Sequence, residues 1–184
     1  MTETTRPAAK RERRPPPPLD AAALERLALR YVERFATTRG RLADYLKRKV
    51  RERGWEGTPA DPRAVADRMA ELGYIDDRAY AEARATAMTR RGLGARRIAG
   101  AFRQAGIDDV DAQAVAPAIA ESAGAAALAF ARRRRIGPWA RDRADRAGAQ
   151  KQIAAMLRAG HRFDLARRIV ALPPGAEPDA DDFG

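Results

Sequence analysis

Residues 90–107 read RRGLGARRIAGAFRQAGI, and this stretch decides the fold. Its apolar positions follow the 3.6-residue period of an α-helix, because Ile98, Phe102 and the alanines between them fall on one face. A Gly-Leu-Gly break precedes this face, and Gly106 follows it. The stretch therefore predicts a short amphipathic helix between two glycine breaks.

The same helical period continues on both sides. Asp20 and the pair Asp61-Pro62 are placed to begin helices, because Asp caps a helix N-terminus and Pro fits its first turn. Gly54 and Gly73 stand where apolar stripes end. No alternating apolar run indicates a strand, so we predict an all-α fold. The stripes cover residues 24–35, 42–50, 65–72, 76–88, 98–105, 111–119, 128–135, 153–157 and 165–169.

One signal recurs along the chain: two apolar residues four apart, a glycine four residues later, and an apolar residue after it. It occurs as Leu46-Val50-Gly54-Trp55 and as Ile98-Phe102-Gly106-Ile107, and a weaker copy ends in Gly160-His161. A string of unrelated amphipathic helices can imitate a repeat, but the shared glycines favour a true one, with a period of about fifty residues. We expect three tandem three-helix repeats, over 19–73, 74–122 and 123–172, that form an elongated curved body.

Two polar segments flank these repeats. Residues 1–18 are basic and end in four prolines, and residues 173–184 are acidic and proline-rich. Such segments bury too little apolar surface to fold, so we expect two disordered tails.

The chain is strongly basic, with a net charge of +11 over 184 residues. The charges of the two tails cancel, so the excess lies on the predicted repeats. A folded body of this charge attracts polyanions such as nucleic acid, an acidic protein face or anionic lipid. The preference for Arg over Lys also fits a biased codon composition, which weakens the inference from charge alone.

Few residues are available for catalysis. The chain has no cysteine and one histidine, His161, which excludes thiolate nucleophiles, Cys-ligated zinc and multi-histidine metal sites. Ser122 lies in an alanine-rich helix rather than at a strand-to-helix elbow, and Gly92-Leu93-Gly94 lacks the Lys-Ser/Thr of a phosphate loop. The pair Asp76-Asp77 fits a helix N-cap better than a metal or acid pair. We expect no enzymatic activity, no metal and no cofactor.

No apolar stretch approaches the roughly 20 residues of a membrane span, and the N-terminus lacks the apolar core of a secretory signal. We therefore expect a cytoplasmic, monomeric protein with no membrane partner.

The candidate binding residues are basic side chains on the outer faces of two predicted helices, together with Arg90 and Arg91, which precede the glycine break before the second of these helices. A solvated cationic face explains them as well as a binding surface does, and four consecutive arginines at 132–135 must also wrap around their helix. Gly100 faces outward, where it costs roughly 1 kcal/mol relative to Ala, and it offers a partner close access to the backbone. The candidates are Arg90, Arg91, Arg96, Arg97 and Arg103, with Lys47, Arg48 and Arg51 in the preceding repeat.

Four aromatic residues, Tyr45, Trp55, Tyr74 and Tyr80, have two interpretations. They offer rings on which nucleic-acid bases stack. Their helical spacing, or their place just past a helix end, favours the core instead.

Two segments together resemble the RecX regulators of the bacterial RecA recombinase: LGYIDDRAYAEA at 72–83 and RRGLGARRIAGAFRQAGID at 90–108. Ala105 departs from the family pattern, which has a basic residue there, and Ala159-Gly160-His161 departs from its Arg-Gly-Phe ending. The matching residues are Gly73, Tyr74, Asp76, Asp77, Tyr80, Gly92, Gly94, Arg97, Ile98, Gly106 and Ile107.

The resemblance implies three tandem three-helix units that lie in the groove of the RecA filament on single-stranded DNA. It implies a mainly negative regulator that limits filament assembly, ATPase, strand exchange and co-protease activity in DNA repair and the SOS response. The alternative is an autonomous DNA-binding helical-repeat protein, whose affinity for bare DNA would fall steeply with salt. A membrane-surface protein would need a larger bulky apolar face than these helices carry.

Overall fold

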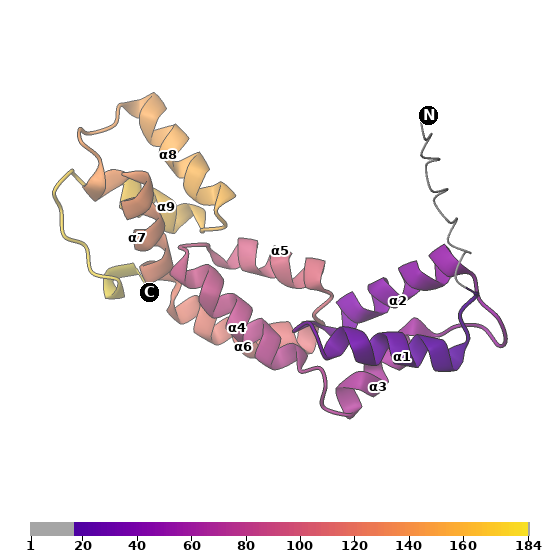
Figure 1. The fold of residues 1–184 in the computed structure, drawn as a ribbon. Helices are drawn as coiled ribbons and strands as arrows, with labels where there is room; N and C mark the ends of the chain where they lie inside the picture. The colour runs from indigo at the N-terminus through magenta and orange to yellow at the C-terminus, as the bar shows by residue number, and fades with distance from the viewer. Residues whose placement is uncertain (1–16, 184) are drawn as a thin grey trace, which may run out of the picture.

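The computed structural model describes residues 17–183, which form an elongated row of helices (Figure 1). Their one strand-like contact is an isolated bridge between Leu19 and Trp55, so the all-α prediction is confirmed for this part of the chain. The predicted tail 1–18 lies outside the described residues except for its last two prolines. The elements are α1 (Ala21–Val32), α2 (Arg39–Arg53), α3 (Pro62–Glu71), α4 (Asp77–Arg90), α5 (Ala95–Ala105), α6 (Asp109–Glu121), α7 (Ala123–Arg134), η1 (Gly137–Trp139), α8 (Arg146–Arg158), α9 (Phe163–Ala171) and η2 (Asp181–Phe183).

Helices α1 and α3 begin at the caps that the sequence predicts. Oδ1 of Asp20 accepts a hydrogen bond from the Ala23 N–H at 2.7 Å, and Oδ1 of Asp61 accepts one from Ala64 at 3.0 Å. These bonds satisfy N–H groups that have no partner inside the helix. Helix α2 is capped in the same way by Thr38, which the sequence analysis did not single out.

Helices α1, α2 and α3 enclose one apolar cluster. Leu24, Leu42 and Leu46 are buried at its centre, and Met69 closes it from α3. The predicted stripe of the first helix extends to Phe35, but α1 ends at Val32 and Phe35 is 52% exposed. That part of the prediction is wrong, because the chain turns toward α2 before the stripe is complete.

Helices α4, α5 and α6 enclose a second cluster around Ile98, Phe102 and Val115. Gly106 ends α5 in the left-handed conformation, with φ at 68°, as its place after the apolar stripe predicts. Each group of three helices therefore buries its own apolar faces.

Helices α7, α8 and α9 form a third cluster around Met156, Leu165 and Ile169. The chain does not leave this cluster at residue 173. Residues 173–183 fold back, η2 packs on α7, and Phe183 is 8% exposed inside the cluster. The prediction of a disordered tail over 173–184 is therefore wrong for 173–183. One aromatic ring near the end outweighs the acidic, proline-rich composition of the segment.

The three clusters follow one another along the molecule, and the second helices of the three groups, α8, α5 and α2, lie along one edge (Figure 1). The elongated shape with three tandem three-helix units agrees with the predicted fold class. An elongated body of this kind is stabilised within each unit and at the joints between neighbouring units.

Helix α6 is alanine-rich and largely exposed, because Val115 is its one buried residue. Within residues 17–183, no single helix is long and apolar enough to cross a membrane. By length and composition alone, α6 and residues 123–139 reach that threshold together, across a bend of 65°.

Candidate functional site

The second helices of neighbouring units meet end to end. At the first joint, the C-terminus of α5 abuts the N-terminus of α2, and the Thr38 hydroxyl donates a hydrogen bond to the Ala105 carbonyl. The backbones of Gly40 and Gly106 touch, because a Cβ on Gly40 would lie 2.6 Å from the Cα of Gly106. Only glycine permits this approach.

The second joint repeats this arrangement with other residues. The C-terminus of α8 abuts the N-terminus of α5, where Gly94 N–H donates to the Ala159 carbonyl at 2.9 Å and Arg96 N–H to the Gly160 carbonyl at 3.2 Å. A Cβ on Gly94 would lie 2.4 Å from the Gly160 carbonyl carbon. Helices α8, α5 and α2 therefore form one row, here called the second-helix row, in which the C-terminus of one helix meets the N-terminus of the next.

His161 completes the second joint. It follows Gly160 as Ile107 follows Gly106, and it is 2% exposed. Its Nε2 lies 3.1 Å from the Gly92 carbonyl, and its ring lies 5.6 Å from that of Phe130. Burial lowers the pKa of His161, against the hydrogen bond to Gly92, which raises it. His161 therefore occupies the position that the buried apolar residue Ile107 holds in the preceding unit.

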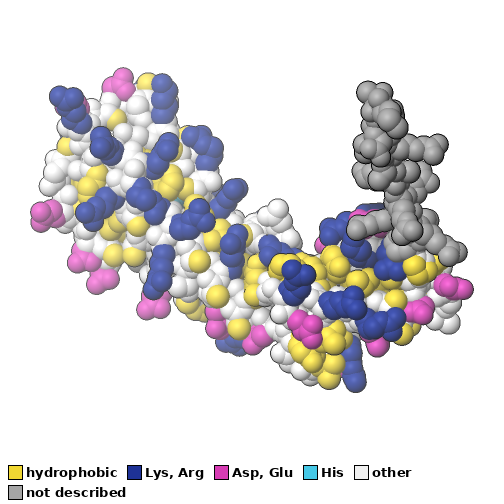
Figure 2. Space-filling model, in the orientation of Figure 1, with side chains coloured by type: hydrophobic (Ala, Val, Ile, Leu, Met, Phe, Trp, Pro, Cys, Tyr) yellow, Lys and Arg dark blue, Asp and Glu magenta, His cyan; other side chains and the backbone are white. Residues whose placement is uncertain are grey.

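The side of α5 in this row is basic and open. Arg96, Arg97 and Arg103 are exposed, and the ion pairs found among the described residues involve none of them. Helix α5 contains no acidic residue. Figure 2 shows dark-blue side chains distributed along the molecule, including the edge formed by the row. Three uncompensated guanidinium groups create a local positive field.

The side of α2 is also exposed, but its cations are partly compensated. Lys47 lies 3.8 Å from Asp44, and Arg48 lies 3.7 Å from Glu52. Arg51 is exposed as well. Of the two predicted basic faces, the face on α5 is therefore the more open to an anionic partner.

Arg90 and Arg91 lie at the end of α4 rather than on α5. Both are exposed, and the Arg90 carbonyl accepts a hydrogen bond from Nη1 of Arg133 at 3.5 Å. Helix α7 thus brings the arginine run 132–135 next to Arg90 and Arg91 at the end of α4, and all four residues of the run are exposed. The structure joins two arginine groups that the sequence analysis treated separately.

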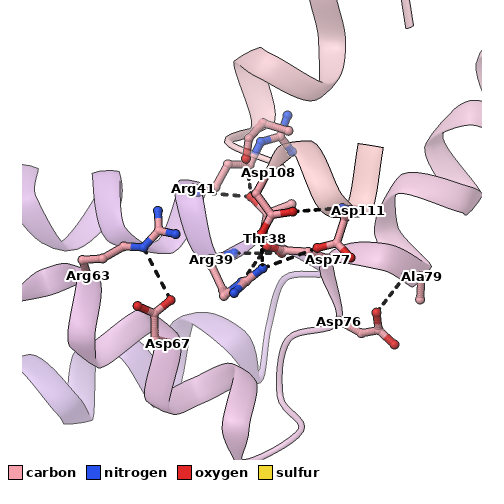
Figure 3. Close-up of polar contacts among 11 residues, drawn as sticks. Thr38, Arg39, Arg41, Arg63, Asp67, Asp76, Asp77, Ala79, Asp108 and Asp111 are labelled. Carbon is pink, nitrogen blue, oxygen red and sulfur yellow. Dashed lines mark hydrogen bonds and ion pairs between the residues drawn. The ribbon is translucent and has the colours of Figure 1, made fainter. Parts of the chain in front are cut away.

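Arg39 is the residue that sequence reasoning missed. It is the first residue of α2, and its Nε donates to Asp77 at 2.9 Å while its backbone N–H donates to the same carboxylate at 3.0 Å (Figure 3). Its Nη2 lies 2.9 Å from Asp108 and 3.4 Å from Asp111. One guanidinium therefore clasps the first unit to the start of α4 and to α6.

The clasp changes the pKa values of its members. The hydrogen bond to Asp77 raises the pKa of Arg39. The backbone N–H of Asp111 lowers the pKa of the Asp108 carboxyl, whereas burial and then the charge of Asp108 raise the pKa of Asp111. Asp77 has a side chain only 2% exposed, so it is a buried ion-pair partner. The expectation that Asp76-Asp77 caps a helix holds for Asp76 alone.

The aromatic residues divide between the two interpretations. Tyr45, Trp55 and Tyr80 are half-buried against the clusters, as the core interpretation predicts. Tyr74 is 51% exposed, so that interpretation is wrong there. Within residues 17–183, no group of three His, Cys, Asp or Glu side chains is placed to hold a metal ion.

Comparison with known proteins places the chain in a family. The regulatory protein RecX of Myxococcus xanthus (strain DK1622) is 33% identical over an alignment of 181 residues that covers 91% of this chain and 96% of the relative. The chain belongs to the RecX family. The crystal structure of RecX from Lactobacillus salivarius has the same fold, with a TM-score of 0.61 and 21% identity over 81% of this chain and 93% of that one. No family model matches the chain.

In this RecX-family chain, the residues that carry the resemblance hold the fold together. Asp76 caps α4 through the Ala79 N–H at 2.8 Å, and the Tyr80 hydroxyl accepts from Nη1 of Arg41 at 2.5 Å. Gly92, which follows α4, packs against α7, and a Cβ on Gly92 would lie 2.7 Å from the backbone nitrogen of Phe130. Tyr80 and Gly92 therefore lie where neighbouring units meet, whereas Asp76 acts within its own unit.

Proposed function

We propose that this protein binds the RecA filament on single-stranded DNA and limits its assembly, ATPase, strand exchange and co-protease activity in DNA repair and the SOS response. Membership of the RecX family supports a regulatory role for the chain. The contact surface in this proposal is the part of the second-helix row that α5 and α2 form, with Arg96, Arg97 and Arg103 on α5 and the basic side of α2.

The observation that carries the proposal is the continuity of that row. Two end-to-end joints align α8, α5 and α2 along one edge of an elongated body. A curved line of cations fits a long partner with regularly spaced negative charge, as a nucleoprotein filament has. A compact partner would contact only part of it.

The arginines of the row determine which chemical groups of the partner it can bind. Guanidinium groups bind carboxylates and phosphates in a bidentate fork, so exposed arginines serve either an acidic protein face or a DNA backbone. Because α5 carries three arginines without acidic neighbours, we expect it to contribute more than α2, whose Lys47 and Arg48 have carboxylate partners.

The test is DNA-stimulated ATP hydrolysis by the cognate RecA recombinase, with this protein titrated in below stoichiometry. We expect inhibition by the natural chain and its loss in the double variant Arg96→Glu, Arg97→Glu. The matched control is Arg26→Glu with Arg84→Glu, which changes the charge equally at exposed positions of α1 and α4, two helices that do not belong to the row. The control should inhibit like the natural chain.

If the α5 double variant keeps its helical circular dichroism and inhibits as well as the natural chain, the second-helix row is not the surface that contacts the filament. No inhibition by the folded natural chain would reject the regulator role. In that case the autonomous DNA-binding function is tested by measuring affinity for bare DNA as a function of salt, which should fall steeply if phosphate contacts dominate.

A further inference from the structure

Three aromatic rings meet where α1 leads into α2, and two of them are stacked while the third is tilted. The ring centroids of Tyr31 and Tyr45 lie 4.4 Å apart with planes inclined by 30°, and those of Tyr31 and Phe35 lie 5.1 Å apart at 50°. Tyr31 comes from the last turn of α1, Phe35 from the connection after it, and Tyr45 from α2. The group therefore brings together rings from three segments of the first unit.

This group is half-buried at its base and exposed at its end. Tyr31 and Tyr45 are half-buried and pack against the apolar cluster of the first unit. Phe35 is 52% exposed. Single exposed apolar residues are ordinary on protein surfaces, but the exposed Phe35 ring, which leans on the half-buried Tyr31 ring, offers an open face for a further ring.

Cations surround the rings. The Arg34 guanidinium lies 5.8 Å from the centroid of Phe35, and the Arg48 guanidinium lies 5.5 Å from that of Tyr45. Arg34 is exposed and is absent from the ion pairs found among residues 17–183, and Arg48 also belongs to the basic side of α2. Figure 2 shows yellow and dark-blue side chains next to one another over α1 and α2. The rings are thus continuous with the second-helix row.

We propose that Tyr31, Phe35 and Tyr45, with Arg34 and Arg48, form a stacking site for unpaired bases of single-stranded DNA. Aromatic faces bind bases and neighbouring cations bind phosphates in proteins that hold single strands. Duplex bases are already stacked on their neighbours, so the site selects single strands. The inference rests on the proposed function, because it assigns the DNA strand a place beside the surface proposed to contact the filament.

The test measures the affinity of the full chain for fluorescein-labelled oligo(dT), for an abasic strand of equal length, and for duplex DNA. Phe35→Ala should weaken binding to oligo(dT) by about five-fold or more, the effect of losing one base stacked on an aromatic ring. It should leave binding to the abasic strand unchanged, since that strand presents phosphates without bases. Phe35→Trp should bind oligo(dT) at least as tightly as the natural chain.

The matched control is Phe163→Ala, which removes a ring of similar exposure (57%) in the third unit. Its affinity for oligo(dT) should stay that of the natural chain. Arg34→Gln should weaken binding to both strands and reduce the slope of log K against log salt by about 0.7, as the loss of one phosphate contact on a single strand requires.

Equal losses on oligo(dT) and the abasic strand, or no loss in Phe35→Ala, would overturn the stacking site. The ATPase experiment separates this outcome from the proposed function. If Phe35→Ala binds oligo(dT) normally while Arg96→Glu, Arg97→Glu abolishes inhibition, only the stacking site is rejected. If the natural chain binds oligo(dT) through Phe35 but does not inhibit RecA, only the regulator role is rejected.

Discussion

Gly40 in the first turn of α2 lies against Gly106 at the end of α5, and a Cβ on either residue would lie within 2.7 Å of the other's Cα. The same contact recurs between Gly94 and Gly160 one unit further along. Two of the three glycines that mark the repeat in the sequence, Gly106 and Gly160, therefore lie where one unit touches the next.

Gly40→Ala should destabilise the first joint, because its Cβ would meet backbone atoms that cannot move aside as a side chain can. We expect a loss of about 1–3 kcal/mol, the usual cost of overpacking. Urea denaturation followed by circular dichroism measures it.

Gly100→Ala is the control for that experiment. A Cβ there would meet only the Arg103 guanidinium, at 3.9 Å, so the substitution should stabilise the chain by roughly 0.5–1 kcal/mol through helix propensity. Equal effects of the two substitutions would show that the Gly40 contact does not restrict the joint. If Gly100→Ala stabilises the fold but weakens RecA inhibition, Gly100 contributes to partner access.

Arg39→Met should cost about 1–3 kcal/mol, because it leaves the buried Asp77 carboxylate without its guanidinium partner. The Arg39 side chain is 27% exposed, so salt partly screens its ion pairs. The loss of stability caused by Arg39→Met should therefore be smaller at high salt than at low salt. Arg78→Ala removes an exposed pair with Glu82 and should change stability by less than about 1 kcal/mol. Similar losses in both variants would contradict the clasp.

The stability of the fold should fall as the pH decreases below about 6.5, the ordinary pKa of an unfolded histidine. Burial lowers the folded pKa of His161, so in this range the unfolded chain binds a proton that the folded chain does not. His161 is the only histidine, and carboxyl groups titrate at lower pH. His161→Gln should flatten the dependence of Tm on pH between about pH 5 and pH 7. An unchanged slope would assign the titration to another group.

Phe183→Ala should destabilise the third unit by roughly 2–4 kcal/mol, as expected for a mostly buried aromatic ring. The Arg168 guanidinium lies 4.8 Å from this ring and donates to the Asp182 carbonyl, so the variant also loosens η2. Asp181→Ala changes an exposed neighbour and should be near neutral. Thermal melts of both variants decide whether residues 173–183 belong to the folded unit.

Local signals predicted most of the helices. Asp20, Asp61 and Gly106 act within a few residues of the helix ends that they fix, and the 3.6-residue period marks the buried faces. These interactions are encoded in neighbouring positions of the sequence, so one sequence is enough to read them.

The contacts between units could not be predicted from local sequence patterns. Arg39 reaches Asp77 and Asp108, which are 38 and 69 residues away in the chain, and nothing near Arg39 in the sequence indicates either partner. Phe183 folds back from a segment whose composition is that of a disordered tail. The candidate arginines were found by their spacing, but only the structure separates the unpaired face of α5 from the partly paired face of α2.

Because the helices of the second-helix row meet end to end, the length of each helix sets the distance between the cationic faces on either side of it. At a rise of 1.5 Å per residue, the 15 residues of α2 extend about 22 Å and the 11 residues of α5 about 16 Å. The spacing of successive cationic faces is therefore set by how many turns each helix has, and the angle between them by glycine contacts that admit no side chain. Inserting one helical turn in α5 would therefore move the cationic face of α2 about 5.4 Å further from α8 without altering any charge.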